Sequence, residues 1–318
     1  MAFASSSLSH RNAGSDRPAT STDQCDLCGS HSCVVVGRFA RDLRPLVNVV
    51  CTRCGLMRRD PMPTEAQLLD YYLHEYRLCL KGSTEPRKRD LARDQIRARQ
   101  RLALLTPLLK PGARVLDFGS GSGLFLKAAK EVGCAVQGIE PDERYACPVR
   151  QELDLPVHNG SWETANFAAG SFDLAVAHHV FEHLRTPTAA LRRLHAWIAD
   201  GGHLYLSVPD IGNPDASPLN RFQRAHMHGF THRTLVMIAL KNGFRLVSVP
   251  DTRATTLVFK RLPVAPAEWL CFPEHGAEMV EFFRRNSLRR YLLHGKAYRR
   301  YANHLTQRAI QRWREMSN

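Results

Sequence analysis

The sequence predicts an α/β protein built on a doubly wound, mostly parallel sheet. From Ala113 to about residue 260, short apolar runs alternate with amphipathic stretches of helical period, as in consecutive strand–helix units. The first run leads directly into a turn with glycine at 119, 121 and 123, and Glu140 ends the second run. A parallel sheet brings both features to the carboxyl ends of its strands, where α/β proteins bind ligands.

The composition is that of an ordinary globular chain. Of the 318 residues, 44% are hydrophobic and 23% are charged, and 44 Lys and Arg against 30 Asp and Glu give a formal net charge of +14. The apolar runs fall short of the roughly 18 residues of a membrane span, and residues 1–24 do not resemble a secretory signal. We therefore expect a cytoplasmic protein with a disordered tail over 1–24.

The elements of the sheet domain, expected over 111–260, can be assigned in order from the apolar runs and the amphipathic stretches. Strands are expected at 113–118, 134–140, 155–159, 171–178 and 202–209, with a closing pair at 244–250 and 254–260. Helices are expected at 124–132, 142–153, 188–199 and 231–242, and a turn is expected at 200–202. This alternation of strand and helix predicts parallel pairing.

Three further segments flank the sheet domain: a cysteine-bearing segment over 25–63, a charged helical connector over 64–110 and an extension over 261–318. From Glu281 onward, ten Lys and Arg stand against two Glu. Apolar residues recur there at helical spacing, at Leu288, Tyr291, Leu292, Tyr298, Ala302, Leu305, Ala309 and Trp313. We expect a basic amphipathic helix packed on the domain, and an anionic partner or membrane surface is the alternative.

Four cysteines form two spaced pairs, Cys25 with Cys28 and Cys51 with Cys54, and glycine follows each pair. Two such turns can direct four thiolates at one tetrahedral site, which suits zinc. A four-cysteine site has no open coordination position, so we expect structural zinc that braces the fold. A degenerate knuckle and redox chemistry are the alternatives.

The glycine turn and Glu140 indicate the kind of ligand. Glycines let a ligand approach the backbone closely. A dinucleotide-binding turn would need glycine at the position of Leu124, which weakens the case for a pyrophosphate. Glu140 stands where a carboxylate accepts hydrogen bonds from both hydroxyls of a ribose. The expected ligand therefore contains a ribose.

Four blocks in order carry a resemblance to a known family: VLDFGSGSGLFLKAAKEVGCAVQGIEPD, GSFDLAVAHHVFEHL, LHAWIADGGHLYLSVPD and HGFTHRTLVMIALKNGFRLV. Over about residues 102–260, the chain resembles the class I S-adenosylmethionine-dependent methyltransferases. The resemblance implies a Rossmann-like sheet and S-adenosylmethionine as the cofactor. It further implies that Asp117, Gly119, Gly121 and Gly123 hold the methionine part and that Glu140 holds the ribose.

The blocks CDLCGS and CTRCGLMRRDPMPTEAQLLDYYLHEY, within about residues 25–76, resemble the N-terminal module of bacterial sugar C-methyltransferases and related small-molecule enzymes. The resemblance implies that an aromatic residue of this module covers the cofactor. Tyr76 and Tyr72 are the candidates, and simple packing is the alternative for either of them.

Histidines follow the fourth and fifth expected strands. His183 is a candidate general base, with an orienting or packing role as the alternative, and His226 and His228 are candidates for contact with the acceptor. His179, Glu182 and His183 also match the H-x-x-E-H string of some metalloproteases. That string needs a long zinc-binding helix, whereas here it begins at an expected sheet edge, so a protease is disfavoured.

The preferred function is methyl transfer from S-adenosylmethionine to a small-molecule acceptor, a sugar or another biosynthetic intermediate, at oxygen or carbon. An RNA methyltransferase with a zinc module is the second hypothesis, and the concentration of basic residues in the C-terminal extension argues against nucleic acid. A non-catalytic ligand-binding protein is the third, because the sequence has Asn159-Gly160-Ser161-Trp162 where the family usually has an acidic adenine contact after the third strand.

Overall fold

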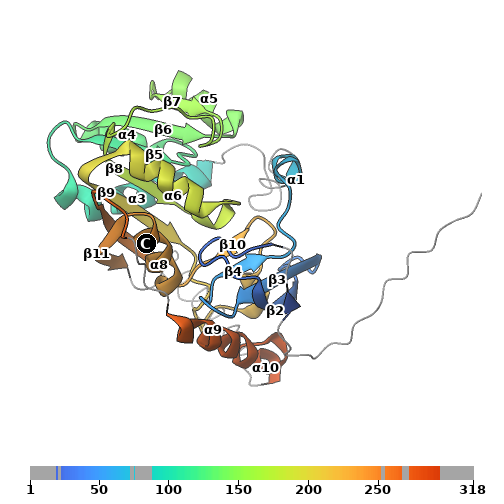
Figure 1. Cartoon of the computed structure of the whole chain (residues 1–318). Helices are drawn as coiled ribbons and strands as arrows, with labels where there is room; N and C mark the ends of the chain where they lie inside the picture. The colour runs from blue at the N-terminus through green and yellow to red at the C-terminus, as the bar shows by residue number, and fades with distance from the viewer. Residues whose placement is uncertain are drawn as a thin grey trace, which may run out of the picture.

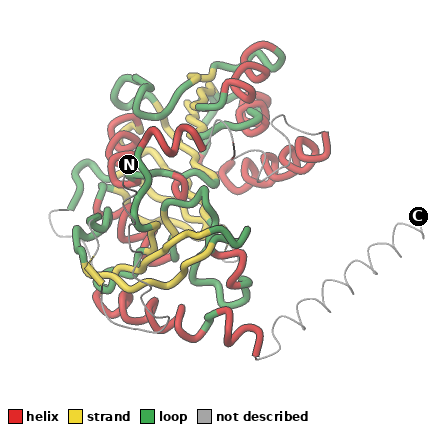
Figure 2. Tube along the Cα trace, turned by 90° about the vertical axis from the view of Figure 1, so that its right-hand side faces the viewer, coloured by secondary structure: helices red, strands yellow, loops and turns green. Residues whose placement is uncertain are grey.

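The computed structural model contains a large sheet of seven strands and a small sheet of five. The structure describes residues 19–20, 23–71, 75, 88–251, 255–266 and 272–293. The small sheet lies below the large one in both views of the chain (Figures 1 and 2). The described part contains no helix long and apolar enough to cross a membrane.

The large sheet confirms the doubly wound, mostly parallel core. From edge to edge its strands are β11 (Phe244–Asp251), β12 (Thr255–Arg261), β9 (Ile198–Val208), β8 (Phe172–His178), β5 (Arg114–Phe118), β6 (Ala135–Glu140) and β7 (Val157–Asn159). The central strand β5 pairs in parallel with β6 and β8, and β6 with β7 and β8 with β9 are also parallel. By contrast, β12 runs antiparallel to both β9 and β11.

Helices cover both faces of the large sheet because its central strands are apolar on both sides. On one face, Leu116 packs in an apolar cluster with α6 (Pro187–Trp197) and α8 (His232–Lys241). On the other face, Val115 packs with α3 (Lys88–Leu105) and α4 (Leu124–Glu131). Further helices are α1 (Glu65–Tyr71), α5 (Glu143–Gln151) and α7 (Pro218–Arg221), with the short turns η2 (Thr106–Leu108) and η3 (Phe181–His183).

The small sheet was not expected from the sequence. Its strands, in order, are β1 (Ala19–Thr20), β2 (Ser32–Phe39), β3 (Pro45–Cys51), β4 (Met57–Arg59) and β10 (His228–Gly229). All neighbouring strands are antiparallel. The first strand lies within the segment expected as a tail, and the last comes from the sheet domain. The small sheet therefore combines residues that are far apart in the chain.

The turn expected at 200–202 is wrong as a separate element, because β9 begins at Ile198 and runs through these residues. Gly201 has a φ of +73°, and the pairing of β8 with β9 shifts in register between Phe172 and Leu174. The glycines therefore produce an irregularity at the start of the strand, and the preceding helix ends earlier, at Trp197.

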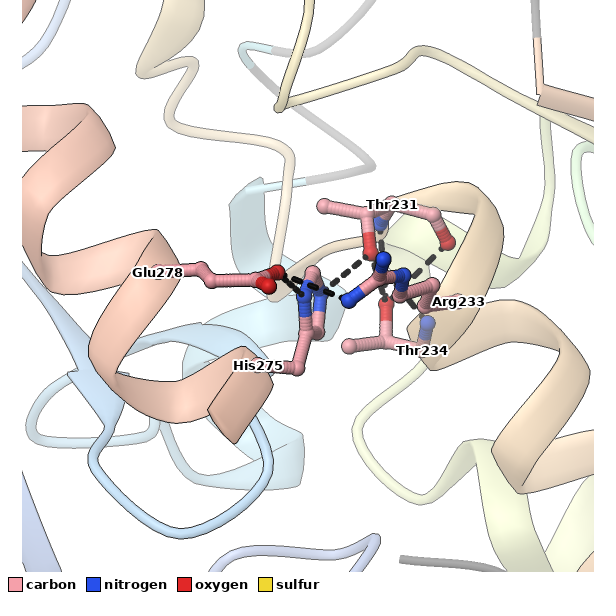
Figure 3. Close-up of polar contacts among 5 residues, drawn as sticks. All are labelled: Thr231, Arg233, Thr234, His275 and Glu278. Atoms are coloured by element: carbon pink, nitrogen blue, oxygen red, sulfur yellow. Dashed lines mark hydrogen bonds and ion pairs between the residues drawn. The ribbon is translucent and has the colours of Figure 1, made fainter. Parts of the chain in front are cut away.

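Polar contacts join helix α9 (Pro273–Arg285) to the start of α8, as Figure 3 shows. Nε2 of His275 lies 2.9 Å from Oγ1 of Thr231, which caps the start of α8. Nδ1 of the same ring lies 3.1 Å from Oε2 of Glu278, and Nη1 of Arg233 donates to that oxygen at 2.8 Å. These bonds hold α9 against the first turn of α8.

Several residues for which the sequence predicts a role lie outside the described part of the chain. Of the basic C-terminal stripe, the structure describes α10 (Leu288–Leu293) and no residue from 294 onward. Tyr72 and Tyr76 also lie outside the described residues. The roles expected for the tyrosines and for the basic helix stay predictions.

Gly276 allows α9 to lie close to the turn between Cys51 and Cys54. A Cβ at this position would overlap the backbone carbonyl of Thr52. We expect Gly276→Ala to lower the free energy of unfolding by about 1–3 kcal/mol, the usual cost of overpacking, as measured by urea denaturation. The exposed neighbour supplies the control: Ala277→Ser should stay within about 0.5 kcal/mol of the wild type. Equal stability of the two variants would contradict the close approach.

Candidate active site

The glycine loop, residues 119–123, connects β5 to α4. Its three glycines have φ values of +89°, +53° and +70°, which side-chain-bearing residues rarely adopt. A Cβ at Gly119 would lie 2.5 Å from Cγ2 of Val180, so the segment after β8 packs directly on the loop. A Cβ at Gly121 would meet no described atom within 4 Å, and Oγ of Ser120 is buried without a hydrogen-bond partner among the described residues. The loop therefore offers open space and a buried hydroxyl to a ligand.

Two buried carboxylates flank the glycine loop, Asp117 near the end of β5 and Glu140 at the end of β6. The carboxylate of Glu140 accepts hydrogen bonds from the backbone N–H of Gly121 at 2.9 Å and of Asp142 at 3.0 Å. Burial raises the pKa of Asp117 to about 6, against the lowering effect of Arg101. The structure thus brings the glycines, Asp117 and Glu140 together at one edge of the sheet.

Arg101 lies near both Asp117 and His178, and the sequence reasoning missed Arg101 and His178. The guanidinium of Arg101, on α3, lies 5.2 Å from the centre of the Phe125 ring, and its Nε is buried without a hydrogen-bond partner among the described residues. Burial and the charge of Arg101 lower the pKa of His178 to about 2. Arg101 could have been found from its position, because it lies three residues after the buried Ala98 and therefore on the apolar face of the helix.

A second group of polar residues, the His–Glu cluster, consists of His179, Glu182, His183 and His226. Glu182 is 2% exposed, and its Oε1 lies 3.2 Å from Nδ1 of His179 and 3.8 Å from Nε2 of His183. Nδ1 of His183 lies 3.0 Å from the carbonyl oxygen of Ala225, and the rings of His183 and His226 are 5.0 Å apart. One ligand atom from each of Glu182, His183 and His226 lies within 4.8 Å of the others.

The cluster joins an ionised carboxylate to imidazoles. Burial opposes the charge of Glu182, but the hydrogen bond with His179 and the charges of the neighbouring histidines lower the pKa of Glu182 to about 2. Burial and the charge of His183 lower the pKa of His226 to about 3. The backbone N–H of Met227 donates to the carbonyl of Glu182 at 2.7 Å, and this bond holds the segment of His226 against the end of β8.

The structure separates His228 from the other histidine of its pair. Its ring is 1% exposed, and its Nδ1 lies 3.0 Å from the carbonyl oxygen of Leu184. Burial lowers the pKa of His228, and its charged neighbours are Asp26 and Arg58, which belong to the cysteine-bearing segment. A catalytic role for His228 stays a prediction from the sequence.

The cysteine cluster consists of Cys25, Cys28, Cys51 and Cys54. The Sγ atoms of Cys25 and Cys54 are 3.5 Å apart, and those of Cys28 and Cys51 are 3.4 Å apart. Four sulfurs around zinc at about 2.3 Å lie about 3.8 Å from one another, whereas a disulfide needs about 2.05 Å. Hydrogen bonding to Cys25 and the other sulfurs, with burial, raises the pKa of Cys54. The positions fit a tetrahedral metal ion, whose charge would offset that of the thiolates.

Hydrogen bonds between side chains and backbone tie the first cysteine turn to helices that pack on the large sheet. The N–H of Thr188, in α6, donates to Oδ2 of Asp26 at 2.8 Å. Nζ of Lys241, at the end of α8, donates to the carbonyl oxygen of Leu27 at 2.6 Å. The first cysteine turn is therefore fixed against both helices on one face of the sheet.

A cavity of about 320 Å³ opens between the small sheet and the segment that precedes His226. Its lining includes Arg41, Tyr71, Arg224 and Ala225. Ala225 also supplies the carbonyl oxygen that contacts His183, so the cavity adjoins the His–Glu cluster. The lining also includes Asp42, and Arg224 is paired with the carboxylate of Glu75, so the cavity presents charges of both signs.

The fold and the site define one class of protein. The sheet order, the glycine loop after the central strand and the acid at the end of the next strand are those of class I S-adenosylmethionine-dependent methyltransferases. A family model described as "Methyltransferase domain" matches residues 87–249, just over half of the chain. The protein belongs to this family.

Curated relatives are similar over part of their length. The ubiquinone biosynthesis O-methyltransferase of Xanthomonas axonopodis pv. citri (strain 306) is 32% identical over 116 residues, which are 34% of this chain and 48% of that relative. The protein of the same name from Pseudomonas aeruginosa (strain LESB58) is 28% identical over 138 residues, 42% of this chain and 55% of that relative. The chain thus spans about half the length of the curated relatives it matches.

Solved structures are similar at lower identity. The 1,6-didemethyltoxoflavin-N1-methyltransferase of Burkholderia thailandensis, with bound 1,6-didemethyltoxoflavin and S-adenosylhomocysteine, has 19% identity and a TM-score of 0.49, covering 68% of this chain and 96% of its own. An S-adenosylmethionine-dependent methyltransferase from Mesorhizobium loti has 18% identity and a TM-score of 0.43, covering 50% of this chain and 96% of its own.

The raised pKa of Asp117 predicts a pH-dependent stability. The pKa of this carboxyl group is 3.8 in the unfolded chain and about 6 in the folded protein. Ionisation of the group therefore destabilises the native state relative to the unfolded state. The wild type should therefore lose stability relative to Asp117→Asn as the pH rises from about 4 to about 6, by about 3 kcal/mol for two pKa units. Above that range the difference should level off. Urea unfolding of both proteins between pH 4 and 7 measures it, and a constant difference would contradict the raised pKa.

Proposed function

We propose that the protein transfers a methyl group from S-adenosylmethionine to a hydroxyl oxygen of a small-molecule acceptor, such as a sugar or another biosynthetic intermediate. The main support for this proposal is the contact of Val180 with the glycine loop. Val180 lies two residues before Glu182, so the contact places the His–Glu cluster beside the loop. A cofactor-binding loop and a cluster suited to proton transfer thereby share one edge of the sheet. Methylation at carbon, implied by the resemblance to sugar C-methyltransferases, is the alternative chemistry.

The groups around the glycine loop suit the parts of the cofactor. S-adenosylmethionine supplies an electrophilic methyl group on a positively charged sulfur. Asp117 and Arg101 place one charge of each sign at the loop, which suits the ammonium and carboxylate of an amino acid. Glu140 would accept hydrogen bonds from the ribose. A carboxylate oxygen accepts more than one hydrogen bond, so its bonds to Gly121 and Asp142 are compatible with this role.

His183 is the proposed proton acceptor. Its Nδ1 donates to Ala225, so in the neutral ring Nε2 carries the lone pair that faces Glu182. Nε2 takes the hydroxyl proton as the acceptor oxygen bonds to the methyl carbon and the sulfur keeps the electrons of the bond that breaks. The negative charge of Glu182, which lies 3.8 Å from the same nitrogen, then stabilises the imidazolium. His226, whose ring lies beside that of His183, is proposed to contact the acceptor.

The cavity and the relatives support a small acceptor. A volume of about 320 Å³ lies within the range of roughly 300–1,000 Å³ that small-molecule sites occupy. Its lining includes Arg41 and Asp42, which can bond to the polar groups of an acceptor. The curated relatives carry the name of an O-methyltransferase, which supports transfer to oxygen.

The cysteine cluster is proposed to hold one structural zinc ion. The sulfur separations and burial suit four thiolates around one ion. Such a site has no open position for a substrate, so its contribution is to stability. Reduced cysteines also suit a reducing compartment, which agrees with the cytoplasmic location expected from the sequence.

Glu140→Ala tests the ribose contact. Losing two hydrogen bonds to a carboxylate, at about 1 kcal/mol or more each, should weaken the binding of S-adenosylmethionine at least about tenfold in a calorimetric titration. Glu143→Ala, at an exposed carboxylate three residues on, should bind as the wild type does. An unchanged affinity in a folded Glu140→Ala protein would refute the ribose role.

Cys51→Ser tests the zinc site, with Cys33→Ser as the matched control, because Cys33 is a buried cysteine of the neighbouring strand outside the cluster. Elemental analysis should find about one zinc per chain in the wild type and the control. The Cys51→Ser protein should lose the metal and melt at a lower temperature. Wild-type protein that is free of metal and equally stable would contradict the proposal.

A further inference from the structure

Glu182 is a buried carboxylate, and only one of its two oxygens has polar partners among the described residues. Its Oε2 is buried and has no hydrogen-bond partner among the described residues, while Oε1 contacts His179 and His183. A buried polar atom without a partner costs about 1–3 kcal/mol, and more when it is charged. An ion or an ordered water at such an atom is the usual explanation in native proteins.

The ring of His183 is oriented so that its lone pair faces this carboxylate. The carbonyl oxygen of Ala225 can only accept a hydrogen bond, so Nδ1, at 3.0 Å, carries the hydrogen. Nε2 of the neutral ring is then an acceptor that faces Oε1 of Glu182 at 3.8 Å. Two acceptors that face one another are stabilised by a cation between them. An Nδ1–H on a backbone carbonyl and an Nε2 directed at the site are typical of histidines that bind metals.

We propose that Glu182, His183 and His226 bind a divalent first-row transition metal ion. Their ligand atoms lie within 4.8 Å of one another. At bond lengths of about 2.1 Å, opposite ligands of a six-coordinate ion lie about 4.2 Å apart, so small side-chain rotations close the site. Two imidazoles and one carboxylate are a donor set that suits zinc and iron, and three protein ligands leave coordination positions open.

The H-x-x-E-H string gains a different meaning in this structure. Glu182 and His183 are adjacent on η3, so the string does not form the zinc-binding helix of a protease. The third ligand, His226, comes from a segment that the bond between Met227 and Glu182 holds in place. His179 contacts Oε1 of Glu182 at 3.2 Å, so it orients the carboxylate.

This site rests on the proposed function in one respect, namely that the acceptor binds beside the glycine loop. An acceptor hydroxyl that enters an open position on the ion is acidified, and its proton is released to water before the oxygen bonds to the methyl carbon. His183 then acts as a ligand in place of the proton acceptor. The metal thus selects acceptors whose hydroxyl oxygen reaches the ion.

Cobalt binding to the full-length protein tests the site without any acceptor. We would titrate the protein with Co²⁺ and follow bound metal by elemental analysis and visible absorption. Thiolate ligands give an intense sulfur-to-cobalt charge-transfer band, whereas a site of nitrogen and oxygen ligands gives weak ligand-field bands. The variants are Glu182→Gln and His226→Gln. The control is His232→Gln, at an exposed histidine at the start of α8.

The wild type and the control should each bind two cobalt ions. One binds at the cysteines and gives the charge-transfer band, and the second gives none. Each of the two cluster variants should bind this ion at least about tenfold more weakly, with its thiolate band, melting temperature and affinity for S-adenosylmethionine unchanged. Should one variant fail to fold, the other decides. A wild type that binds cobalt at thiolates alone, or folded variants that keep the second ion, would overturn the metal site.

The same measurements separate this proposal from the proposed function. Loss of the second cobalt in the variants supports the metal site even where no acceptor is methylated, and that result would count against the proposed function alone. Methylation by a wild-type protein that binds no metal at the cluster would support the proposed function and refute the metal site.

Discussion

The packing of Val180 against Gly119 is the contact on which the site depends. β5 and β8 are parallel neighbours, so the segments that follow them leave the sheet at the same edge. The side chain of Val180 packs this closely on the loop because residue 119 has no Cβ. A side chain there would push the two segments apart, and with them the glycine loop and the cluster around Glu182. The spacing between the glycine loop and the cluster around Glu182 therefore depends on glycine at position 119.

The small sheet positions the segment that carries His226. The N–H of Met227 donates to the carbonyl of Glu182, and its own carbonyl accepts a bond from the N–H of Arg59 in β4. The next residue, His228, pairs with Arg58 across the sheet. One short stretch of backbone thus connects the end of β8 to the strand that follows the cysteines. Distortion of the cysteine turns would be transmitted to the candidate acceptor site through these bonds.

The strands and helices of the large sheet could be predicted from local sequence. The strands β2, β3 and β4 were not predicted, although each pairs with its neighbour in the chain. The strands of the large sheet are apolar on both faces, and the glycines and Glu140 mark their ends. In contrast, β10 exists because β4 offers it a partner, and two residues give no recognisable pattern.

The same reasoning explains the site residues. His226 and His228 would share a face in a continuous strand, but β10 begins at His228, so the two rings have different neighbours. Arg101 lies on a helix far from any motif, and its proximity to Asp117 follows from packing alone.

The pairing of β4 with β10 also bears on the order in which the chain can fold during synthesis. Arg58 is made early, but its partner His228 emerges only after five strands of the large sheet. Contacts between residues so distant in the chain form late, since closing the intervening loop is entropically costly. The N-terminal segment, although translated first, would reach its final edge only once most of the large sheet exists. A nascent chain would thus expose an unpaired strand edge through much of translation, and such edges favour misassociation.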